Sequence, residues 1–395
     1  MPRHHRRVSL AVLLAVVSIA SSRSRPHLQA PSEAPSGCNF PRPRSTVVLG
    51  QCIIAGNSDG TIGGLSGAYF ENHFLWAVTD SRTQSHLLRF ALSLDPNRTE
   101  SPLTIQSPSR EVALRRHAVL GGDVITQAEA MAPSRTNVFW VAAEQTAPGL
   151  FRCDAGTGNC DASVPLPPSF KEIDTRRGIE GLASSPSGRL LVAALEGPRR
   201  SSPEAENHWT RLATFDTGAG GNEPTAMQEY LYPVDWIAHD ATDEGIGVTD
   251  VLFITEHELL VMERGWFARC GNTVRLYRVR LDAASAIASG VSLPAPLTKA
   301  LVLDLHDYGP QLADLQTFGI LWRGKLRETL ENFEALAWGP SLPDGTRTLL
   351  LISDDNFKRE NSTNQVTAVL ALRWSALWNG GPVQSSHSAA LPRCQ

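Results

Sequence analysis

Several patterns that would place this 395-residue chain in a particular class are missing. No interior stretch approaches the roughly 20 consecutive apolar residues that a membrane-spanning helix needs, so a polytopic membrane protein is excluded. The 36 Lys and Arg residues are outnumbered by 40 Asp and Glu residues, and no basic surface is expected to bind a nucleic-acid backbone. With 31 Gly and 26 Pro, the chain is neither collagen-like nor of low complexity.

Motifs of several enzyme classes are also absent. No C-x-x-C pair and no H-E-x-x-H helix occurs, which argues against a zinc site. Ser66 lies in Gly-Gly-Leu-Ser-Gly rather than in a G-x-S-x-G elbow, so it lacks the context of an α/β-hydrolase nucleophile. No Walker A loop is present, and the Gly-rich turn at residues 218–221 has no βαβ context for a dinucleotide.

The first twenty residues have the pattern of a secretory signal peptide. Arg3, Arg6 and Arg7 precede an apolar run over residues 10–20 that is too short to span a bilayer, with cleavage expected before Ser21. The Ser-, Pro- and Arg-rich residues 21–45 then form a disordered linker. We expect a folded domain over residues 46–378, a C-terminal tail over 379–395, and a secreted or periplasmic monomer with no membrane attachment after cleavage.

Six cysteines remain after that cleavage: Cys38, Cys52, Cys153, Cys160, Cys270 and Cys394. An even count in an exported chain favours disulfides. Cys153 and Cys160 bracket a Gly-rich turn, so we predict that they pair. The other four allow three connectivities, among which the sequence does not choose.

One pattern recurs five times along the chain. A short motif is followed by a turn and then by a β-rich apolar run that ends on a carboxylate. The motifs are Gly-Gly-Leu-Ser-Gly at 63–67, Ala-Glu-Ala-Met at 128–131, Ile-Glu-Gly-Leu at 179–182, Val-Thr-Asp-Val at 248–251 and Phe-Glu-Ala-Leu at 333–336. The runs are too short for helices and are bounded by turn residues, as is typical of buried strands.

The spacing of these copies predicts an all-β chain folded as a β-propeller. The terminal acids stand at positions 80, 144, 196, 263 and 354, so successive copies are 64, 52, 67 and 91 residues apart, enough for a four-stranded sheet and its loops. We expect five or six blades and prefer six, because residues 46–54 could complete another blade. Residues 311–334 have a helix-like pattern and are expected as an insertion. A two-layer sandwich would not explain five strands that each end on an acid.

The terminal acids predict a metal site. The innermost strand of each blade faces the propeller axis, so acids at equivalent strand ends converge there and need a compensating cation or arginines. Oxygen ligands without His or Cys favour Ca²⁺, with Mg²⁺ as the alternative. The predicted metal ligands are Asp80, Glu144, Glu196, Glu263 and Asp354, with Glu129, Glu180, Asp250 and Glu334 as a second layer. The alternative is that these acids cap turns or pair with arginines.

Cationic side chains lie close to several of these acids in the sequence. They are Arg82, Arg176, Arg177, Arg264, Lys358 and Arg359. A carboxylate-bound metal with guanidinium groups at its rim suits phosphoester hydrolysis, because the metal activates water while Arg holds the phosphoryl oxygens. The predicted catalytic residues are Arg177 and Arg264, with Glu180 or Glu334 as general base. Structural ion pairs are the alternative.

The ordered motifs together resemble one known family. Besides the repeats, they include Arg-Gly-Ile-Glu-Gly-Leu at 177–182, Glu-Arg-Gly at 263–265, Val-Arg-Leu-Tyr-Arg-Val at 274–279 and Ser-Asp-Asp-Asn-Phe at 353–357. From about residue 62 to 374 the chain resembles the phytase-like domain family, exported proteins also described as having esterase-like activity of phytase. The resemblance implies a β-propeller and a phosphoester or ester hydrolase. The chain lacks the Asp-Asp-Pro-Ala-Ile-Trp signature of true propeller phytases.

The sequence thus predicts an exported, divalent-metal-dependent hydrolase of small phosphate esters or related esters. One alternative is a non-catalytic propeller that binds a ligand or a protein. A second is a lactonase-like ester hydrolase, although such propellers use an Asn- and His-bearing centre, whereas this one is nearly all Asp and Glu.

Overall fold

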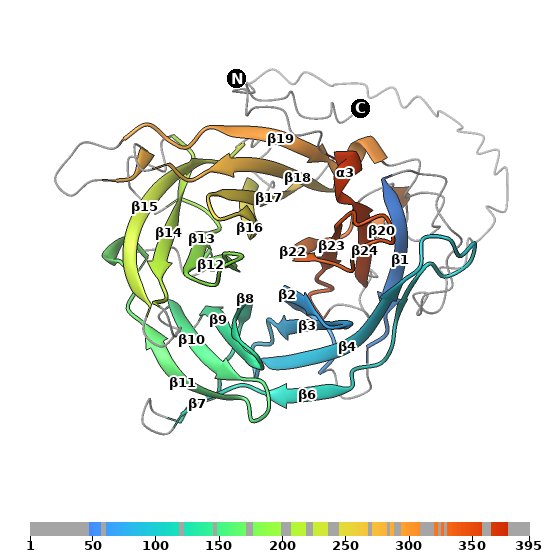
Figure 1. The fold of residues 1–395 in the computed structure, drawn as a ribbon, viewed down its shortest axis with the longest axis horizontal. Coiled ribbons are helices and arrows are strands. Elements are labelled where there is room, and N and C mark those ends of the chain that lie inside the picture. Colours follow the sequence, from blue (N-terminus) through green and yellow to red (C-terminus); the bar gives the residue numbers. More distant parts are fainter. Residues whose placement is uncertain are drawn as a thin grey trace, which may run out of the picture. The chain divides into compact units, whose positions relative to one another are not determined.

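Five antiparallel sheets, each built on a meander of four strands, surround one axis in the part of the chain that the structure describes (Figure 1). The computed structural model describes residues 47–56, 61–117, 122–144, 148–170, 177–198, 207–218, 224–235, 245–267, 271–282, 285–287, 294–308, 320–322, 325–327, 330–357 and 365–377. All of them belong to one compact unit, residues 34–395. The predicted β-propeller is confirmed.

The first three blades follow one another along the chain. Blade 1 contains β2 (Leu65–Glu71), β3 (Phe74–Thr79), β4 (His86–Leu94) and β5 (Leu103–Ile105), and β6 (Arg110–Ala113) also pairs with β4. Blade 2 contains β8 (Ala128–Arg135), β9 (Val138–Glu144), β10 (Pro148–Asp154) and β11 (Asn159–Val164), with β7 (Arg115–Arg116) at its outer edge. Blade 3 contains β12 (Ile179–Ser184), β13 (Leu190–Leu195), β14 (Trp209–Asp216) and β15 (Thr225–Pro233).

Blade 5 is completed by the beginning of the described chain. Blade 4 contains β16 (Gly245–Thr255), β17 (Glu258–Phe267), β18 (Gly271–Arg280) and β19 (Lys299–Asp304). Blade 5 contains β22 (Phe333–Trp338), β23 (Thr348–Ser353) and β24 (Thr367–Arg373), and its outer strand is β1 (Val48–Ile54), which pairs antiparallel with β24. The segment considered for a sixth blade therefore closes the fifth.

The remaining elements are short. Two 3₁₀ turns cover Pro168–Phe170 and Leu305–Tyr308, and the helix α3 covers Trp374–Leu377. The segment with the helix-like pattern instead contains a two-stranded antiparallel sheet, β20 (Ile320–Trp322) with β21 (Lys325–Arg327). In residues 320–327, strand pairing therefore prevails over the helix-like sequence pattern. Residues 311–319 lie outside the described part of the chain. Among the described residues, no helix is long and apolar enough to cross a membrane.

Turn chemistry in the sequence sets the hairpins between first and second strands. Asn72 and His73 between β2 and β3 both have left-handed backbone conformations, as a two-residue hairpin turn of the favoured twist requires. Asn137, Gly188 and Gly345 supply positive φ at the corresponding turns of blades 2, 3 and 5. The apolar runs of the repeats accordingly become the buried second strands β3, β9, β13, β17 and β23.

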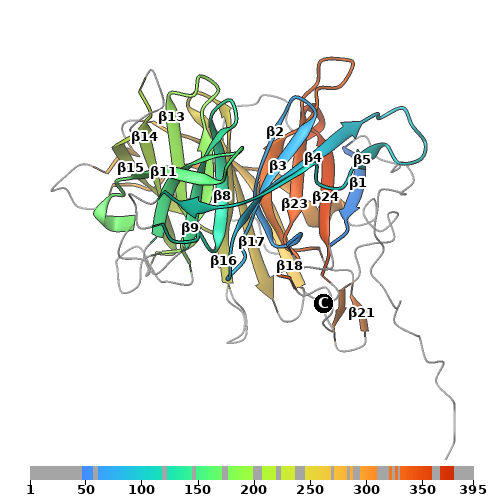
Figure 2. The same cartoon turned by 90° about the horizontal axis from the view of Figure 1, so that it is seen from below.

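The hydrophobic core is divided among the spaces between adjacent blades. Leu65, Leu88 and Leu103 of blade 1 pack with Leu350 and Val369 of blade 5, and four similar clusters join the other neighbouring pairs. The side view shows the sheets standing steeply around the axis (Figure 2). Two predicted pairing partners, Cys153 and Cys160, are joined by a disulfide across the β10–β11 hairpin, which confirms that prediction, and Cys52 is disulfide-bonded as well.

Leu49 tests the closing role of β1, because its buried side chain belongs to the core between blades 5 and 1. We expect Leu49→Ala to lower the free energy of unfolding by about 2–5 kcal/mol, the usual cost of such a cavity in a core. Urea unfolding measures it. Met227→Ala is the control, since Met227 is 54% exposed, and it should change the free energy by less than about 0.5 kcal/mol. A similarly small effect of Leu49→Ala would contradict the closing role.

Candidate functional site

Each inner strand carries an irregularity at the same place near its beginning. The pairing register of the first hairpin in every blade shifts across one residue, which is left without a cross-strand partner. The residues concerned are Ser66, Glu129, Glu180, Thr249 and Glu334. A bulge of this kind redirects a side chain out of the sheet. We call the end of the axis where the inner strands begin the entry end.

The bulged residues gather at the entry end. Ser66 Oγ lies 3.5 Å from Glu334 Oε2, across the contact between blades 1 and 5. The charges of Glu129 and Glu334 both raise the pKa of Glu180, after burial. Three carboxyl groups and two hydroxyl groups from five different blades therefore form one ring around the axis.

Four of the predicted metal ligands surround this ring from the second strands. Asp80, Glu144, Glu196 and Asp354 end or directly follow β3, β9, β13 and β23. The expectation that these acids lie on the innermost strands is wrong, because the innermost strands carry the preceding motifs instead. The two sets are nevertheless adjacent: the Glu334 charge adds to burial in raising the pKa of Asp80 to about 7.

Glu263 does not join the other four predicted ligands. In blades 1, 2, 3 and 5 the residue opposite the start of the inner strand is Thr79, Ala143, Leu195 or Ser353, one position before the acid. In blade 4 the residue at that position is Glu263 itself, opposite Val248. Since successive side chains of a strand point to opposite faces, the position equivalent to the four acids belongs to Arg264.

Arg264, one of the predicted catalytic residues, points toward the entry end. Its Nη2 lies 2.9 Å from Glu334 Oε1, and both side chains are about seven-eighths buried, with 16% and 13% exposed. The Asn332 side-chain amide donates a second hydrogen bond of 2.8 Å to the same oxygen. Two predicted catalytic residues, Arg264 and Glu334, are thus held together in one ion pair.

Arg177 and Glu180 also lie at the entry end. Arg177 Nε is 4.0 Å from Glu196 Oε2, and the next backbone amide, of Gly178, donates to the Glu144 carboxylate. Arg82 lowers the pKa of Asp80, opposing its acidic neighbours. The other predicted cations, Arg176, Lys358 and Arg359, lie outside the described residues.

Burial and mutual repulsion favour the protonated form of several acids at this end. Burial is the largest cause and raises the pKa of Glu129, Glu180 and Asp354 well above the ordinary values. Neighbouring carboxylates add to it, with Asp80 acting on both Glu129 and Asp354. One oxygen of Asp80, Oδ1, is buried and has no hydrogen-bond partner among the described residues. Among the described residues, the acids of this centre outnumber the arginines beside them, Arg82, Arg177 and Arg264.

Asp250 does not belong to the ring of bulged residues; its carboxylate instead binds backbone amides of two inner strands. Its carboxylate accepts hydrogen bonds from the backbone amides of Val251, at 2.8 Å, and Leu336, at 2.6 Å. It thereby ties inner strand β16 to β22. In the fourth repeat the bulged residue is Thr249, so the acid of that motif points away from the axis.

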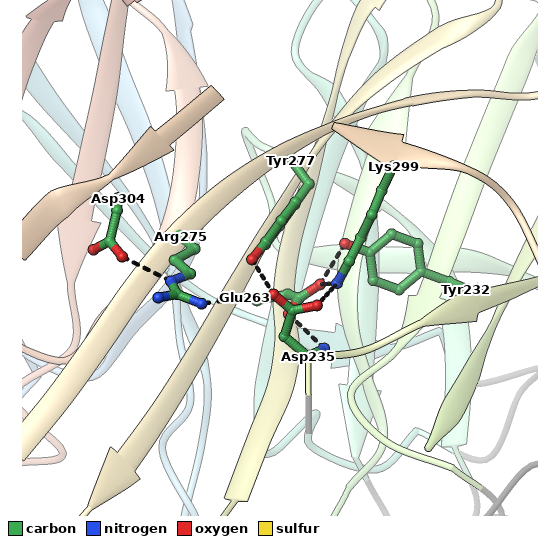
Figure 3. A network of polar contacts seen from close by, with 7 residues as sticks. All are labelled: Tyr232, Asp235, Glu263, Arg275, Tyr277, Lys299 and Asp304. Carbon is green, nitrogen blue, oxygen red and sulfur yellow. Dashed lines mark hydrogen bonds and ion pairs between the residues drawn. The ribbon is translucent and has the colours of Figure 1, made fainter. Parts of the chain in front are cut away.

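Glu263 lies instead in a buried polar network between blades 3 and 4 (Figure 3). Lys299 Nζ bonds both Glu263 and Asp235, the latter at 2.8 Å. Tyr232 and Tyr277 donate hydroxyl hydrogen bonds to Glu263 and Asp235, and both rings lie close to the Lys299 ammonium. The Arg275 side chain links Asp235 to Asp304. Every charge in this network has an opposite partner, so it serves the fold rather than a ligand.

No donor set is gathered around a single point. In the described part of the chain, no three His, Cys, Asp or Glu side chains are arranged to hold a metal ion. From the sequence, Glu129 is expected in the second layer of acids around the metal, and neither Ser66 nor Thr249 is expected at the site. The bulge falls on the second residue of the last four motifs and on the fourth residue, Ser66, of the first, so an alignment that matches Leu65 with Ala128, Ile179, Val248 and Phe333 would have found all three.

Comparison with known proteins agrees with this architecture. The family model for phytase-like proteins, described as esterase-like activity of phytase, matches residues 60–357. The chain belongs to this phytase-like family. The family supports a propeller of the hydrolase type. No curated protein matches the phytase-like chain.

Solved structures similar to this phytase-like propeller are distant. The allergen Mala s 1 of Malassezia sympodialis is 16% identical, with 85% of this chain and 91% of that chain covered and a TM-score of 0.37. A bifunctional GH43-CE protein of Bacteroides eggerthii is 9% identical, with 86% and 35% covered and a TM-score of 0.40. The N-terminal domain of Nup159 is 9% identical, with 87% and 100% covered and a TM-score of 0.32. None of these similarities carries an argument about function.

Asp80 predicts a specific dependence of stability on pH. Because its folded-state pKa of about 7 exceeds the ordinary 3.8, the folded protein binds more protons than the unfolded chain between these values. The free energy of unfolding therefore falls as pH rises through this window. In chelator, Asp80→Asn should match the wild type near pH 4 and exceed it at pH 8, by up to about 4 kcal/mol.

Urea unfolding at pH 4, 6 and 8 measures this difference. Asp161→Asn is the control of opposite sign, because hydrogen bonding to Arg152 lowers the pKa of Asp161, and this variant should lose stability at pH 8. A difference between Asp80→Asn and the wild type that stays constant over the three pH values would contradict the interpretation.

Substitution of Lys299 measures how much the network in Figure 3 contributes to the free energy of unfolding. Lys299→Met removes the ammonium that pairs with the buried Glu263 carboxylate and leaves Asp235 with Arg275 alone, so we expect the free energy of unfolding to fall by about 3–5 kcal/mol. Arg373→Met is the matched control. It breaks the Arg373–Asp344 pair, in which Asp344 is 56% exposed, and should cost less than about 1 kcal/mol in the same urea titration. Equal effects of the two variants would argue against a buried network.

Proposed function

We propose that this phytase-like protein is an exported hydrolase that cleaves phosphate esters or related esters at the entry end of the propeller axis. The observation that carries the proposal is the ring of bulged carboxyl groups, Glu129, Glu180 and Glu334, beside the guanidinium groups of Arg177 and Arg264. Export is supported by the signal-like residues 1–20 and by the Cys153–Cys160 disulfide, a bond typical of oxidising compartments.

Hydrolysis of an ester needs a group that moves a proton and a group that stabilises negative oxygen. Glu180 is the proposed proton-transfer residue, because the residue is half-buried and burial together with the neighbouring acids favours the protonated form of its carboxyl. Arg264 is the proposed oxyanion partner, with Arg177 as the second cation. The ion pair to Arg264 and the hydrogen bond from Asn332 fix the orientation of Glu334 before any substrate binds.

A divalent cation would complete this site. The donor chemistry fits calcium, because the acids offer only oxygen atoms and the buried Asp80 Oδ1 has no hydrogen-bond partner among the described residues. We propose that Asp80, Glu129, Glu334 and Asp354 hold the ion, with Glu144 and Glu196 around them. The side chains must move to do so, because they are not yet gathered around one point. When bound, Ca²⁺ neutralises the acids and polarises an ester or phosphoryl oxygen.

In the absence of a metal ion, the negative charge of the entry-end acids determines which substrates can bind there. The acids of the entry end repel a phosphate monoester dianion, and Arg177 and Arg264 already have carboxylate neighbours. A neutral carboxylic ester meets no such repulsion. Phosphate-ester hydrolysis should therefore depend on added cation more strongly than hydrolysis of a neutral ester.

The experiment is an assay of the mature protein, with bound metal measured first, on p-nitrophenyl phosphate, phytate, p-nitrophenyl acetate and a lactone. Each substrate is tested in Ca²⁺ and in chelator. We expect turnover of p-nitrophenyl phosphate in Ca²⁺ and its loss in chelator. Glu180→Gln should reduce kcat/KM by about 10²–10⁴-fold, the usual contribution of a general acid or base. The exposed Asp161→Asn should leave kcat/KM unchanged.

The other outcomes separate the remaining functions. Calcium binding without turnover of any substrate would contradict the hydrolase and favour a non-catalytic propeller that binds a ligand. Turnover restricted to the lactone would favour a lactonase-like enzyme. Phosphate-ester hydrolysis of equal rate in chelator would contradict the metal, and an unchanged Glu180→Gln variant would contradict the assigned proton-transfer residue.

A further inference from the structure

A cavity of about 440 Å³ lies at the opposite end of the axis, where the inner strands end. Residues from all five inner strands line it, including Phe70 of β2, Met131 of β8, Leu182 of β12, Phe253 of β16 and Trp338 of β22. The acids of the entry end come from earlier positions of the same strands. The volume lies within the range of small-molecule pockets in proteins. We call this space the exit cavity.

The walls of the exit cavity suit a ligand with both an apolar and a polar part, because serines and one arginine lie beside the apolar residues. Most of its lining residues are aliphatic or aromatic, and none of those that line it is acidic. Trp338 is held in place, because its Nε1 donates a 2.9 Å hydrogen bond to the Phe253 carbonyl oxygen and its ring meets the edge of Trp374. The apolar surface is therefore preformed rather than collapsed.

One cation lies in this wall. The Arg347 guanidinium carbon lies 3.5 Å from the centroid of the Trp338 ring, so the planar group is stacked in a fixed place. Within the described residues, no carboxylate pairs with it. Arg152, which also lies near a tryptophan ring, bonds Asp161 instead. Arg347 remains exposed as a residue, yet loss of surrounding water lowers the pKa of its guanidinium.

A second polar group in the cavity also has no partner. Ser134 Oγ is buried without a hydrogen bond among the described residues, although buried hydroxyl groups are nearly always satisfied. Of these two groups, the exposed guanidinium of Arg347 is the one that a ligand in the cavity can reach, and a carboxylate would pair with it. The remaining atoms of the ligand would contact the partly exposed side chains of Phe70, Leu252 and Trp338.

We propose that the exit cavity binds a small carboxylic acid with an apolar body, of about the size of a medium-chain fatty acid, whose carboxylate contacts Arg347. Carboxylate and guanidinium match geometrically and form paired, charge-assisted hydrogen bonds. The apolar chain removes water from the aromatic wall. The site uses none of the entry-end acids, so it stands independently of the proposed hydrolase activity.

The test is isothermal titration of the full protein with octanoate, 1-octanol and octylamine. We expect octanoate to bind at least about 10-fold more tightly than octanol, which lacks the charge, and octylamine to bind least. Arg347→Met should remove the preference for octanoate over octanol. Arg89→Met is the matched control, because Arg89 also stacks on an aromatic ring, Phe74, outside the cavity, and it should change nothing.

A second variant separates loss of the site from loss of the fold. Ser134→Phe fills the cavity and should abolish binding of both octanoate and octanol, while thermal unfolding stays cooperative. Equal affinity of the wild type for octanoate and octanol, absence of octanoate binding, or unchanged octanoate affinity in Arg347→Met would each overturn the proposal.

Discussion

The closure of the ring through β1 is the interaction on which the rest of the structure depends. β1 precedes the first blade in the sequence but pairs with β24 of the last, so the two ends of the propeller are hydrogen-bonded to each other. Its side chains Leu49, Cys52 and Ile54 enter the core between blades 5 and 1. β1 thereby covers the edge of β24 and becomes the outer strand of blade 5, and each inner strand is placed between two neighbouring blades.

Closure forces like charges together at the entry end. Once the inner strands are fixed around one axis, the bulge near the beginning of each strand turns its side chain toward the same end of that axis. Glu129, Glu180 and Glu334 then share a partly buried space, where burial and the charge of Glu334 raise the pKa of both Glu129 and Glu180. The repulsion between these acids persists in the folded protein. Among the described residues, Arg177 and Arg264 lie beside the acids and compensate only part of their negative charge. Such unfavourable arrangements are common where a protein binds or transforms a ligand.

The sequence predicts the architecture well because its signals are local. Short apolar runs, turn residues such as Asn72 and Gly345, and the repeat itself depend on neighbouring residues, and so does the Cys153–Cys160 pairing. The number of blades is less local: whether residues 48–54 form another blade or close an existing one depends on contact with β24, more than 300 residues away in the chain. Residues 320–327 show the same limit, since pairing decides between helix and strand there.

The composition of the site is harder to predict because it depends on strand register. Glu263 ends an apolar run like the other terminal acids, but it pairs directly with Val248 of β16. In the other four blades, the residue that precedes the terminal acid takes this pairing position. This difference of one residue moves Glu263 into the Lys299 network and brings Arg264 to the axis. Register is a property of two strands at once, so a pattern read along one strand does not contain it.

Between the two ends of the axis, neighbouring inner strands make close backbone contacts at two glycines. A side chain at Gly67 would collide with the backbone of Ala130 and Met131 on the neighbouring inner strand, so β2 and β8 approach there as closely as only glycine permits. At Gly181, β12 likewise meets the backbone of β16. These contacts lie between the bulged acids and the exit cavity along the same strands. The two ends can therefore have opposite chemistry, acidic at one and apolar with a cation at the other, because no side chain connects them at these contacts.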